Sequence, residues 1–160
     1  MIFVAVGTQK FQLNRLLMKI DELIESGKIK GDNVFAQTGH SDYVPKHYQY
    51  KKFLNKNEFD SCISECEILI THSGVGTIIA GMKCKKPIIV FPRLAKFKEH
   101  VDDHQLQIAD SFSEQNFVLL CNENDDLMEL IEKTKVTVFS VYNSQKNNVI
   151  DEIRRYLKTF

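Results

Sequence analysis

The sequence of 160 residues lacks any apolar run that approaches the ~20 residues needed to cross a bilayer. Its apolar beginning, residues 1–6, is too short for a signal peptide and has no basic leader. Both absences predict a cytoplasmic protein. The chain also lacks net charge, since 21 Lys and Arg residues balance 21 Asp and Glu residues. This balance argues against nucleic acid as a partner and against direct attachment to an anionic membrane.

Metal and disulfide signatures are missing as well. The four cysteines form no CxxC pair and most lie in apolar patterns, which predicts reduced thiols rather than a disulfide or zinc framework. His100 and His104 are four residues apart on an expected helix, but no third ligand is spaced to join them. We therefore expect neither a metal nor a cofactor. Basic residues gather between positions 83 and 98, and their spacing alone favours a solvated face.

Short apolar strands alternate with amphipathic helices along the chain. An apolar content of 43% over 160 residues fits one domain, residues 1–160. Strands are expected at 2–6, 33–37, 49–54, 67–71, 87–91 and 117–121. Helices are expected at 13–26, after Asn55, and at 75–83, 99–113, 124–133 and 148–160, while 134–142 is ambiguous between strand and loop. The alternation predicts an α/β fold with a doubly wound, Rossmann-like parallel sheet.

The turn at residues 71–77 is the expected ligand site. Ser73, Gly74 and Gly76 leave the backbone bare, and the helix that starts near Val75 offers free N–H groups to a phosphate. A tight turn without a ligand is equally consistent with this stretch alone. In the common strand order, the strands at 2–6 and 67–71 are neighbours, so the loop Gly7-Thr8-Gln9 would face this turn across one crevice.

Two common nucleotide sites are excluded by their missing motifs. The sequence has no GxGxxG with a distant acid, which argues against NAD, and no GxxxxGK[ST], which argues against a P-loop nucleotidase. A diphosphate held by backbone N–H groups and by the hydroxyls of Ser73, Thr77 and Thr8 remains. A nucleotide-sugar fits this description.

Three ordered motifs carry a family resemblance: residues 71–77, 87–93 and 99–105, preceded by Val4-Ala5-Val6-Gly7-Thr8. Together they resemble the C-terminal domain of family 28 glycosyltransferases. The chain is similar to the small subunits of split bacterial exopolysaccharide and capsule glycosyltransferases and of the eukaryotic dolichol-linked N-acetylglucosaminyltransferase. The resemblance implies the C-terminal half of a GT-B enzyme that binds a UDP-sugar donor. A separate membrane-anchored subunit would bind the lipid-linked saccharide acceptor and recruit the chain to the inner face of the plasma membrane.

The same resemblance implies a set of donor-binding residues, with the diphosphate at the turn and the sugar hydroxyls at the His-Gln pair. The set is Gly7, Thr8, His72, Ser73, Gly74, Val75, Gly76, Thr77, Arg93, His104 and Gln105. Two positions depart from the relatives: Ala80 replaces a ribose-binding Glu, and Gln9 replaces a His that follows the Gly-Thr pair. The implied reaction inverts the anomeric carbon without a metal, and its general base is not identified.

Two functions follow from these residues. The retained turn and His-Gln pair favour a hexosyltransferase subunit in exopolysaccharide or capsule biosynthesis. The departures at Gln9 and Ala80 favour a non-catalytic subunit that stabilises or activates such an enzyme. The C-terminal stripe at 149, 150, 153, 157 and 160 either packs on the chain's own sheet or binds the partner subunit, and the resemblance favours the partner.

Overall fold

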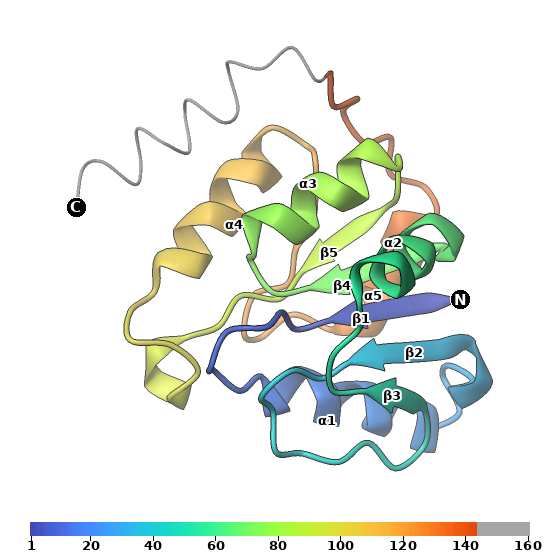
Figure 1. Ribbon diagram of the computed structural model, residues 1–160. Coiled ribbons are helices and arrows are strands. Elements are labelled where there is room, and N and C mark those ends of the chain that lie inside the picture. Colours follow the sequence, from blue (N-terminus) through green and yellow to red (C-terminus); the bar gives the residue numbers. More distant parts are fainter. Residues whose placement is uncertain (144–160) are drawn as a thin grey trace.

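The computed structural model describes residues 1–143, which form one parallel sheet covered by helices on both faces (Figure 1). The strands are β1 (Ile2–Ala5), β2 (Val34–Gln37), β3 (Gln49–Lys51), β4 (Ile68–Thr71), β5 (Ile88–Val90) and β6 (Leu119–Leu120). Their order is β3-β2-β1-β4-β5-β6, and each neighbouring pair is parallel. The predicted doubly wound sheet is confirmed, including the adjacency of β1 and β4.

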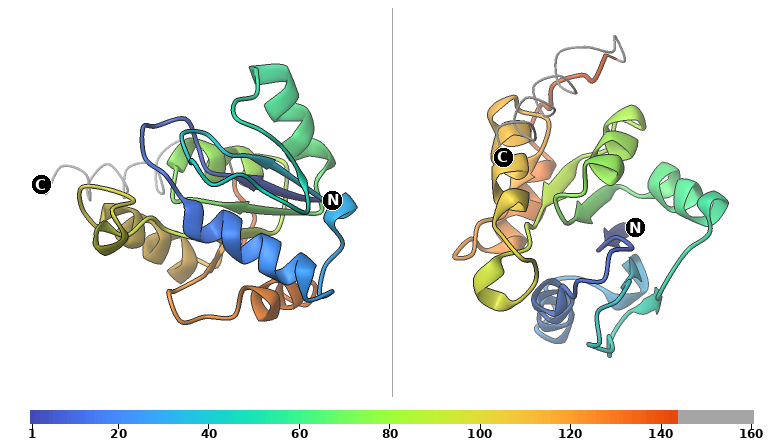
Figure 2. Two further views of the ribbon diagram at one scale, coloured as in Figure 1. Left: turned by 90° about the horizontal axis from the view of Figure 1, so that it is seen from below. Right: turned by 60° about the vertical axis from the view of Figure 1, so that its left-hand side comes forward.

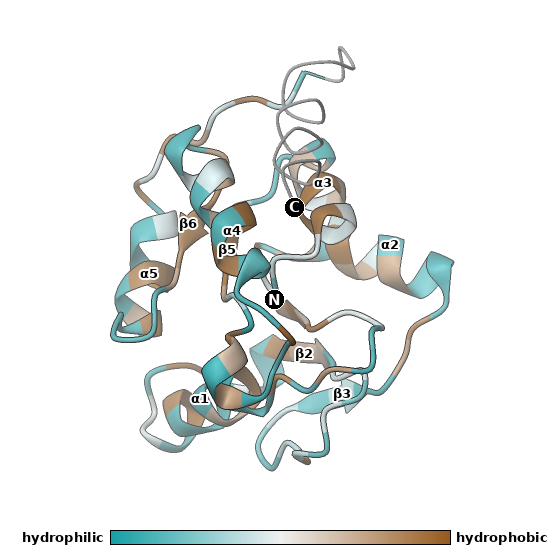
Figure 3. Ribbon diagram, turned by 90° about the vertical axis from the view of Figure 1, so that its left-hand side faces the viewer, coloured by the Kyte–Doolittle hydropathy of each residue, from teal (hydrophilic) through white to brown (hydrophobic). Residues whose placement is uncertain are grey.

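The helices are α1 (Asn14–Glu25), α2 (Lys56–Glu65), α3 (Val75–Lys83), α4 (His104–Glu114) and α5 (Leu127–Thr134). Two short 3₁₀ turns, η1 (Gly31–Asn33) and η2 (Ala95–Phe97), interrupt the loops. The apolar sides of α1 and α5 pack on one face of the sheet, and those of α2, α3 and α4 pack on the other. Figures 2 and 3 show α1 and α5 on one side of the strands and α2 on the opposite side.

Strand β1 shows how the sequence builds these two layers. Its four residues are buried, and because side chains alternate along a strand, Ile2 and Val4 join the core under α1 while Phe3 and Ala5 join the core under α3. Removing a side chain such as Phe3 from water contributes ~1.5–3 kcal/mol. A strand that is apolar on both faces is therefore fixed at the centre of the sheet.

Two predicted helix starts are wrong. The helix expected from Glu99 begins at His104, because the Glu99 and Asp103 carboxylates bind the backbone N–H groups of Leu94 and Ala95 and hold the preceding segment as a loop. The helix expected from Asn124 begins at Leu127, where the Asp126 side chain caps it by accepting from Met128 N–H.

Other boundaries shift less. The strand expected at 49–54 ends at Lys51, and residues 135–143 contain neither a helix nor a strand. The predicted C-terminal helix at 148–160 and its apolar stripe lie outside the described residues. Within residues 1–143, every helix is too short or too polar to span a bilayer.

Candidate functional site

The His72 side chain joins two loops at the carboxyl edge of the sheet. It follows β4 directly, and its imidazole lies between Gly7, which follows β1, and Gly74, which precedes α3. A Cβ atom at Gly7 would lie 2.6 Å from His72 Cε1, and one at Gly74 would lie 2.3 Å from His72 Nε2. Gly7 also has φ of +80°, a conformation that disfavours other residues. Both glycines are therefore required by the close approach of this ring.

The imidazole of His72 is held at its other nitrogen. Nδ1 lies 3.3 Å from the carbonyl oxygen of Ala5 and 3.3 Å from Thr71 Oγ1. Burial, together with the nearby positive charge of Arg93, lowers the pKa of His72 to about 4. The ring is therefore neutral at neutral pH and adds no charge to the turn.

The helix α3 presents its N-terminus at the same edge. Its N-cap residue is Gly74, and no side chain caps it, so the first N–H groups of the helix have no acceptor within the helix. Gly76 is exposed, and a Cβ atom there would meet no other atom within 4 Å. The hydroxyl of Ser73 is buried and has no hydrogen-bond partner in the described part of the chain. Bare backbone, a helix N-terminus and an unpaired hydroxyl together suit an anion.

Arg93, which follows β5, crosses to the loop after β1. Its side chain is 1% exposed, and its Nε and Nη2 groups donate to the backbone carbonyls of Val6, Phe11 and Gln12. Burial, partly offset by the charge of Glu99, lowers the pKa of Arg93 to about 10, so the guanidinium stays protonated at neutral pH. Nη1 is buried and makes no hydrogen bond within residues 1–143. Arg93 thus ties the end of β5 to the loop after β1 and leaves one buried donor group unpaired.

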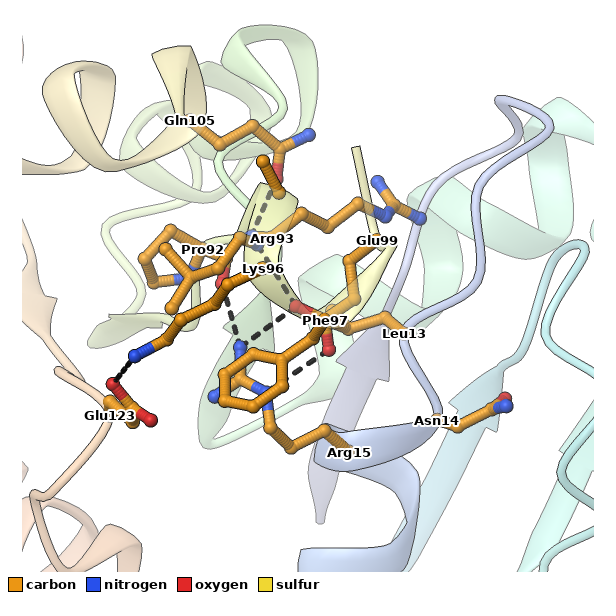
Figure 4. Close-up of polar contacts among 12 residues, drawn as sticks. Leu13, Asn14, Arg15, Pro92, Arg93, Lys96, Phe97, Glu99, Gln105 and Glu123 are labelled. Atoms are coloured by element: carbon orange, nitrogen blue, oxygen red, sulfur yellow. Dashed lines mark hydrogen bonds and ion pairs between the residues drawn. The ribbon is translucent and has the colours of Figure 1, made fainter. Parts of the chain in front are cut away.

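Arg15 of α1 fixes the other end of the β5–α4 loop (Figure 4). Its Nε and Nη2 atoms lie 3.0 and 2.9 Å from the two carboxylate oxygens of Glu99, a bidentate pair, and Glu99 is 1% exposed. The guanidinium carbon of Arg15 also lies 4.3 Å from the ring centroid of Phe91 and 4.7 Å from that of Phe97. The loop that leads to His104 and Gln105 is therefore braced from α1.

The predicted sugar-binding pair lies at the start of α4. The Gln105 side chain is buried, and its Oε1 accepts the backbone N–H of Arg93 at 3.0 Å. Figure 4 shows its amide nitrogen turned away from Arg93. His104 Nδ1 lies 2.7 Å from Asp102 Oδ2. Of the remaining predicted residues, Thr8 is exposed on the loop after β1, whereas Val75 and Thr77 are half-buried in the first turn of α3.

An aromatic pair beside the loop after β1 was not expected from the sequence. The ring centroids of Phe53 and His40 lie 5.1 Å apart, and Phe53 is 46% exposed. The loop that carries His40 touches the loop after β1, since a Cβ atom at Gly39 would lie 2.4 Å from the carbonyl oxygen of Gly7. An exposed aromatic residue just after a strand that ends at this edge was the available signal. The pair offers a flat apolar surface to a ring-shaped group.

A cavity of about 520 Å³ lies beyond β5 and β6, where Leu94, Leu106 and Asn122 contribute to its wall. An ion pair between Lys96 and Glu123 joins η2 to the loop after β6 beside it. Residues of the glycine turn do not line this cavity. Of the basic residues between positions 83 and 98, those at 83, 85 and 86 lie at the end of α3 that is opposite to the turn. Their distance from the turn agrees with a solvated face.

The chain matches the glycosyltransferase family 28 C-terminal domain over residues 1–156. It belongs to this family. A UDP-N-acetylglucosamine–N-acetylmuramyl-(pentapeptide) pyrophosphoryl-undecaprenol N-acetylglucosamine transferase of Prochlorococcus marinus is 29% identical over 149 residues, which cover 89% of this chain and 40% of that protein. The UDP-N-acetylglucosamine transferase subunit ALG13 of Debaryomyces hansenii is 29% identical over 108 residues, covering 68% of this chain and 42% of that protein. The chain thus spans less than half the length of these relatives.

Solved structures of two glycosyltransferase proteins share the fold. An NMR structure of ALG13 has a TM-score of 0.59 at 19% identity and covers 98% of this chain and 94% of that chain. MurG of Acinetobacter baumannii has a TM-score of 0.55 at 16% identity and covers 84% of this chain and 40% of that chain. Likenesses at this identity show the fold alone, and this fold is the Rossmann-like half of GT-B glycosyltransferases.

Proposed function

We propose that the chain is the donor-binding subunit of an inverting hexosyltransferase and that it binds a UDP-sugar at the turn 72–77. One observation carries the proposal: an uncapped helix N-terminus, an exposed bare backbone at Gly76 and the buried, unpaired Ser73 hydroxyl meet at one edge of the sheet. A diphosphate satisfies all three, because its oxygens accept hydrogen bonds and its charge is favoured by the helix dipole.

The other parts of the donor have matching surfaces. The aromatic pair His40 and Phe53 would receive the uracil ring, and Ala80 leaves the ribose without a carboxylate partner from α3. Gln105 and His104 would contact the sugar at the head of α4. During transfer, charge grows on the departing UDP, and the dipole of α3 together with the unpaired Nη1 of Arg93 would stabilise it.

The acceptor side belongs to a second protein in this proposal. The name of one relative describes N-acetylglucosamine transfer to a pyrophosphoryl-undecaprenol substrate, which supports a lipid-linked saccharide acceptor. Another relative is named a transferase subunit, which supports a partner protein, and we propose that this partner is anchored in the membrane. We extend this to synthesis of exopolysaccharide or capsule at the inner face of the plasma membrane, on the strength of the sequence motifs. The residues at 148–160 are proposed to bind the partner.

A titration calorimetry experiment separates this function from a non-catalytic activating subunit. UDP should bind the purified chain, and GDP should bind more weakly because a purine is larger than the base the aromatic pair would accept. An activating subunit that merely keeps the fold would bind neither nucleotide. Addition of the chain to membranes from a strain that lacks it should restore transfer from a radiolabelled UDP-sugar, whereas the chain alone should transfer little.

A further inference from the structure

The loop before α4 contains a pair of histidines bridged by one carboxylate. His100 Nδ1 lies 3.1 Å from Asp102 Oδ1, and His104 Nδ1 lies 2.7 Å from Asp102 Oδ2. Hydrogen bonds from His104 lower the pKa of Asp102, so its carboxylate is ionised and can only accept. Nδ1 of His100 must therefore carry the hydrogen, which leaves Nε2 with a lone pair. This is the arrangement in which a carboxylate prepares an imidazole to accept a proton.

His100 also packs against the loop after β1. Its ring centroid lies 4.5 Å from that of Phe11, a residue of the loop after β1 whose carbonyl accepts from Arg93. The charged form of His100 is close enough to His72 to contribute to the lowered pKa of that ring. The His100 side chain is 17% exposed, so it is packed in place yet reachable by a second substrate.

Other proton acceptors at this edge are engaged or shielded. Glu99 is bound by Arg15, Asp103 accepts the backbone N–H of Ala95, and His72 is buried between two glycines. Gln9, on the loop after β1, has an amide that cannot take a proton at neutral pH. Within residues 1–143, Asp102 orients the imidazoles of both His100 and His104. The proposed function assigns His104 to the donor sugar, so His100 remains as the oriented imidazole for the acceptor hydroxyl.

We infer that His100, oriented by Asp102, is the general base of the transfer reaction, an inference that rests on the proposed function. Nε2 of His100 takes the proton of the acceptor hydroxyl as the acceptor oxygen bonds to the anomeric carbon of the donor sugar. The bond from that carbon to the diphosphate oxygen breaks, and its electron pair leaves with UDP. Asp102 stabilises the imidazolium through Nδ1–H, and the proton passes to solvent after product release.

The test compares His100→Ala, Asp102→Asn and the control His47→Gln, whose side chain is exposed and outside the site. Each variant is added to membranes from a strain lacking the chain, with radiolabelled UDP-glucose, UDP-galactose, UDP-N-acetylglucosamine and UDP-glucuronic acid as donors. His100→Ala should lower kcat by about 100-fold, within the range for general bases. Its affinity for UDP should change less than twofold. Asp102→Asn should lower kcat by a smaller factor, and His47→Gln should behave as the wild type.

Chemical rescue separates a base from a packing residue. The His100→Ala chain has space beside Phe11, so added imidazole should raise the transfer rate of this variant at least tenfold. Transfer by His100→Ala within threefold of wild type would overturn the inference while leaving the proposed function intact. A rate loss that imidazole does not restore would also overturn it, because the residue would then only shape the loop. A wild-type chain that neither binds UDP nor supports transfer would remove the proposed function and the inference together.

Discussion

Replacing Gly76 by Ala should separate stability from binding, because the two effects have opposite signs. Gly76 lies in the first turn of α3, and a Cβ atom there meets nothing within 4 Å. Glycine within a helix costs about 0.5–1 kcal/mol relative to alanine, so the Gly76→Ala chain should be more stable by that amount. For a domain of this length, the Tm should rise by roughly 1–4 °C.

The same methyl group should weaken UDP binding. It would occupy the open space beside the N–H groups that the diphosphate is proposed to reach, and each lost hydrogen bond to a charged group costs ~1.5–3 kcal/mol. The loss of one such bond corresponds to a fall in affinity of roughly 10- to 100-fold. Thermal unfolding gives the first quantity, and titration calorimetry with UDP gives the second.

Gly27→Ala is the matched control. Gly27 has φ of +74° and open space around its Cβ position, at the end of α1 and away from the turn. Alanine in this left-handed conformation should cost about 1 kcal/mol, while the affinity for UDP should stay unchanged. If Gly76→Ala bound UDP as tightly as the wild type, the diphosphate would not lie at the N-terminus of α3. Gly74→Val is a poorer test, because its side chain would collide with His72.

Other substitutions in and around the proposed site, and a C-terminal truncation, have distinct expected effects. Gln105→Ala should lower sugar transfer more than UDP affinity, and equal losses in both assays would contradict its assignment to the sugar. Arg15→Met should lower the free energy of unfolding by about 3 kcal/mol by leaving the buried Glu99 carboxylate unpaired, and Glu99→Gln added to it should recover part of that loss in urea denaturation. The pKa of His72 is lowered from its ordinary value of 6.5 to about 4 in the folded chain, so the unfolded chain is protonated at a higher pH than the folded chain. The free energy of unfolding should therefore fall by about 3 kcal/mol as the pH is lowered from 6.5 to 4. His72→Asn should flatten this dependence. Truncation after Asn148 should abolish co-purification with a membrane partner, and undiminished pairing would contradict that role.

The architecture was predictable because its signals are local. The apolar run at Ile2–Ala5 is buried on both sides, and the helical period of α1 places its apolar residues under the sheet. The helix start expected at Glu99 was wrong because the Glu99 and Asp103 carboxylates bind the backbone N–H groups of Leu94 and Ala95, and Arg15, 84 positions away in sequence, holds the Glu99 carboxylate in that place. No pattern within that segment records this contact.

The meeting of two loops at the candidate site was also predictable from the strand order. The turn after β4 and the loop after β1 were expected to meet, and the strand order brings them together. Patterns could not show that His72 fills the space between Gly7 and Gly74, since this depends on how two loops pack. They also could not show that Arg93 donates hydrogen bonds to backbone carbonyls, or that the rings of Phe53 and His40 are in contact.

We propose that a UDP diphosphate binds the N-terminus of α3 between the loops after β1 and β4. The most direct measurement is a UDP titration of the isotope-labelled chain, followed through the backbone amide resonances. The amides of residues 73–77 should shift most, together with those of residues 7–9, and saturation should give the Kd measured by calorimetry. Shifts confined to residues that line the cavity beyond β5 and β6, with residues 73–77 unchanged, would show that UDP does not bind at the N-terminus of α3.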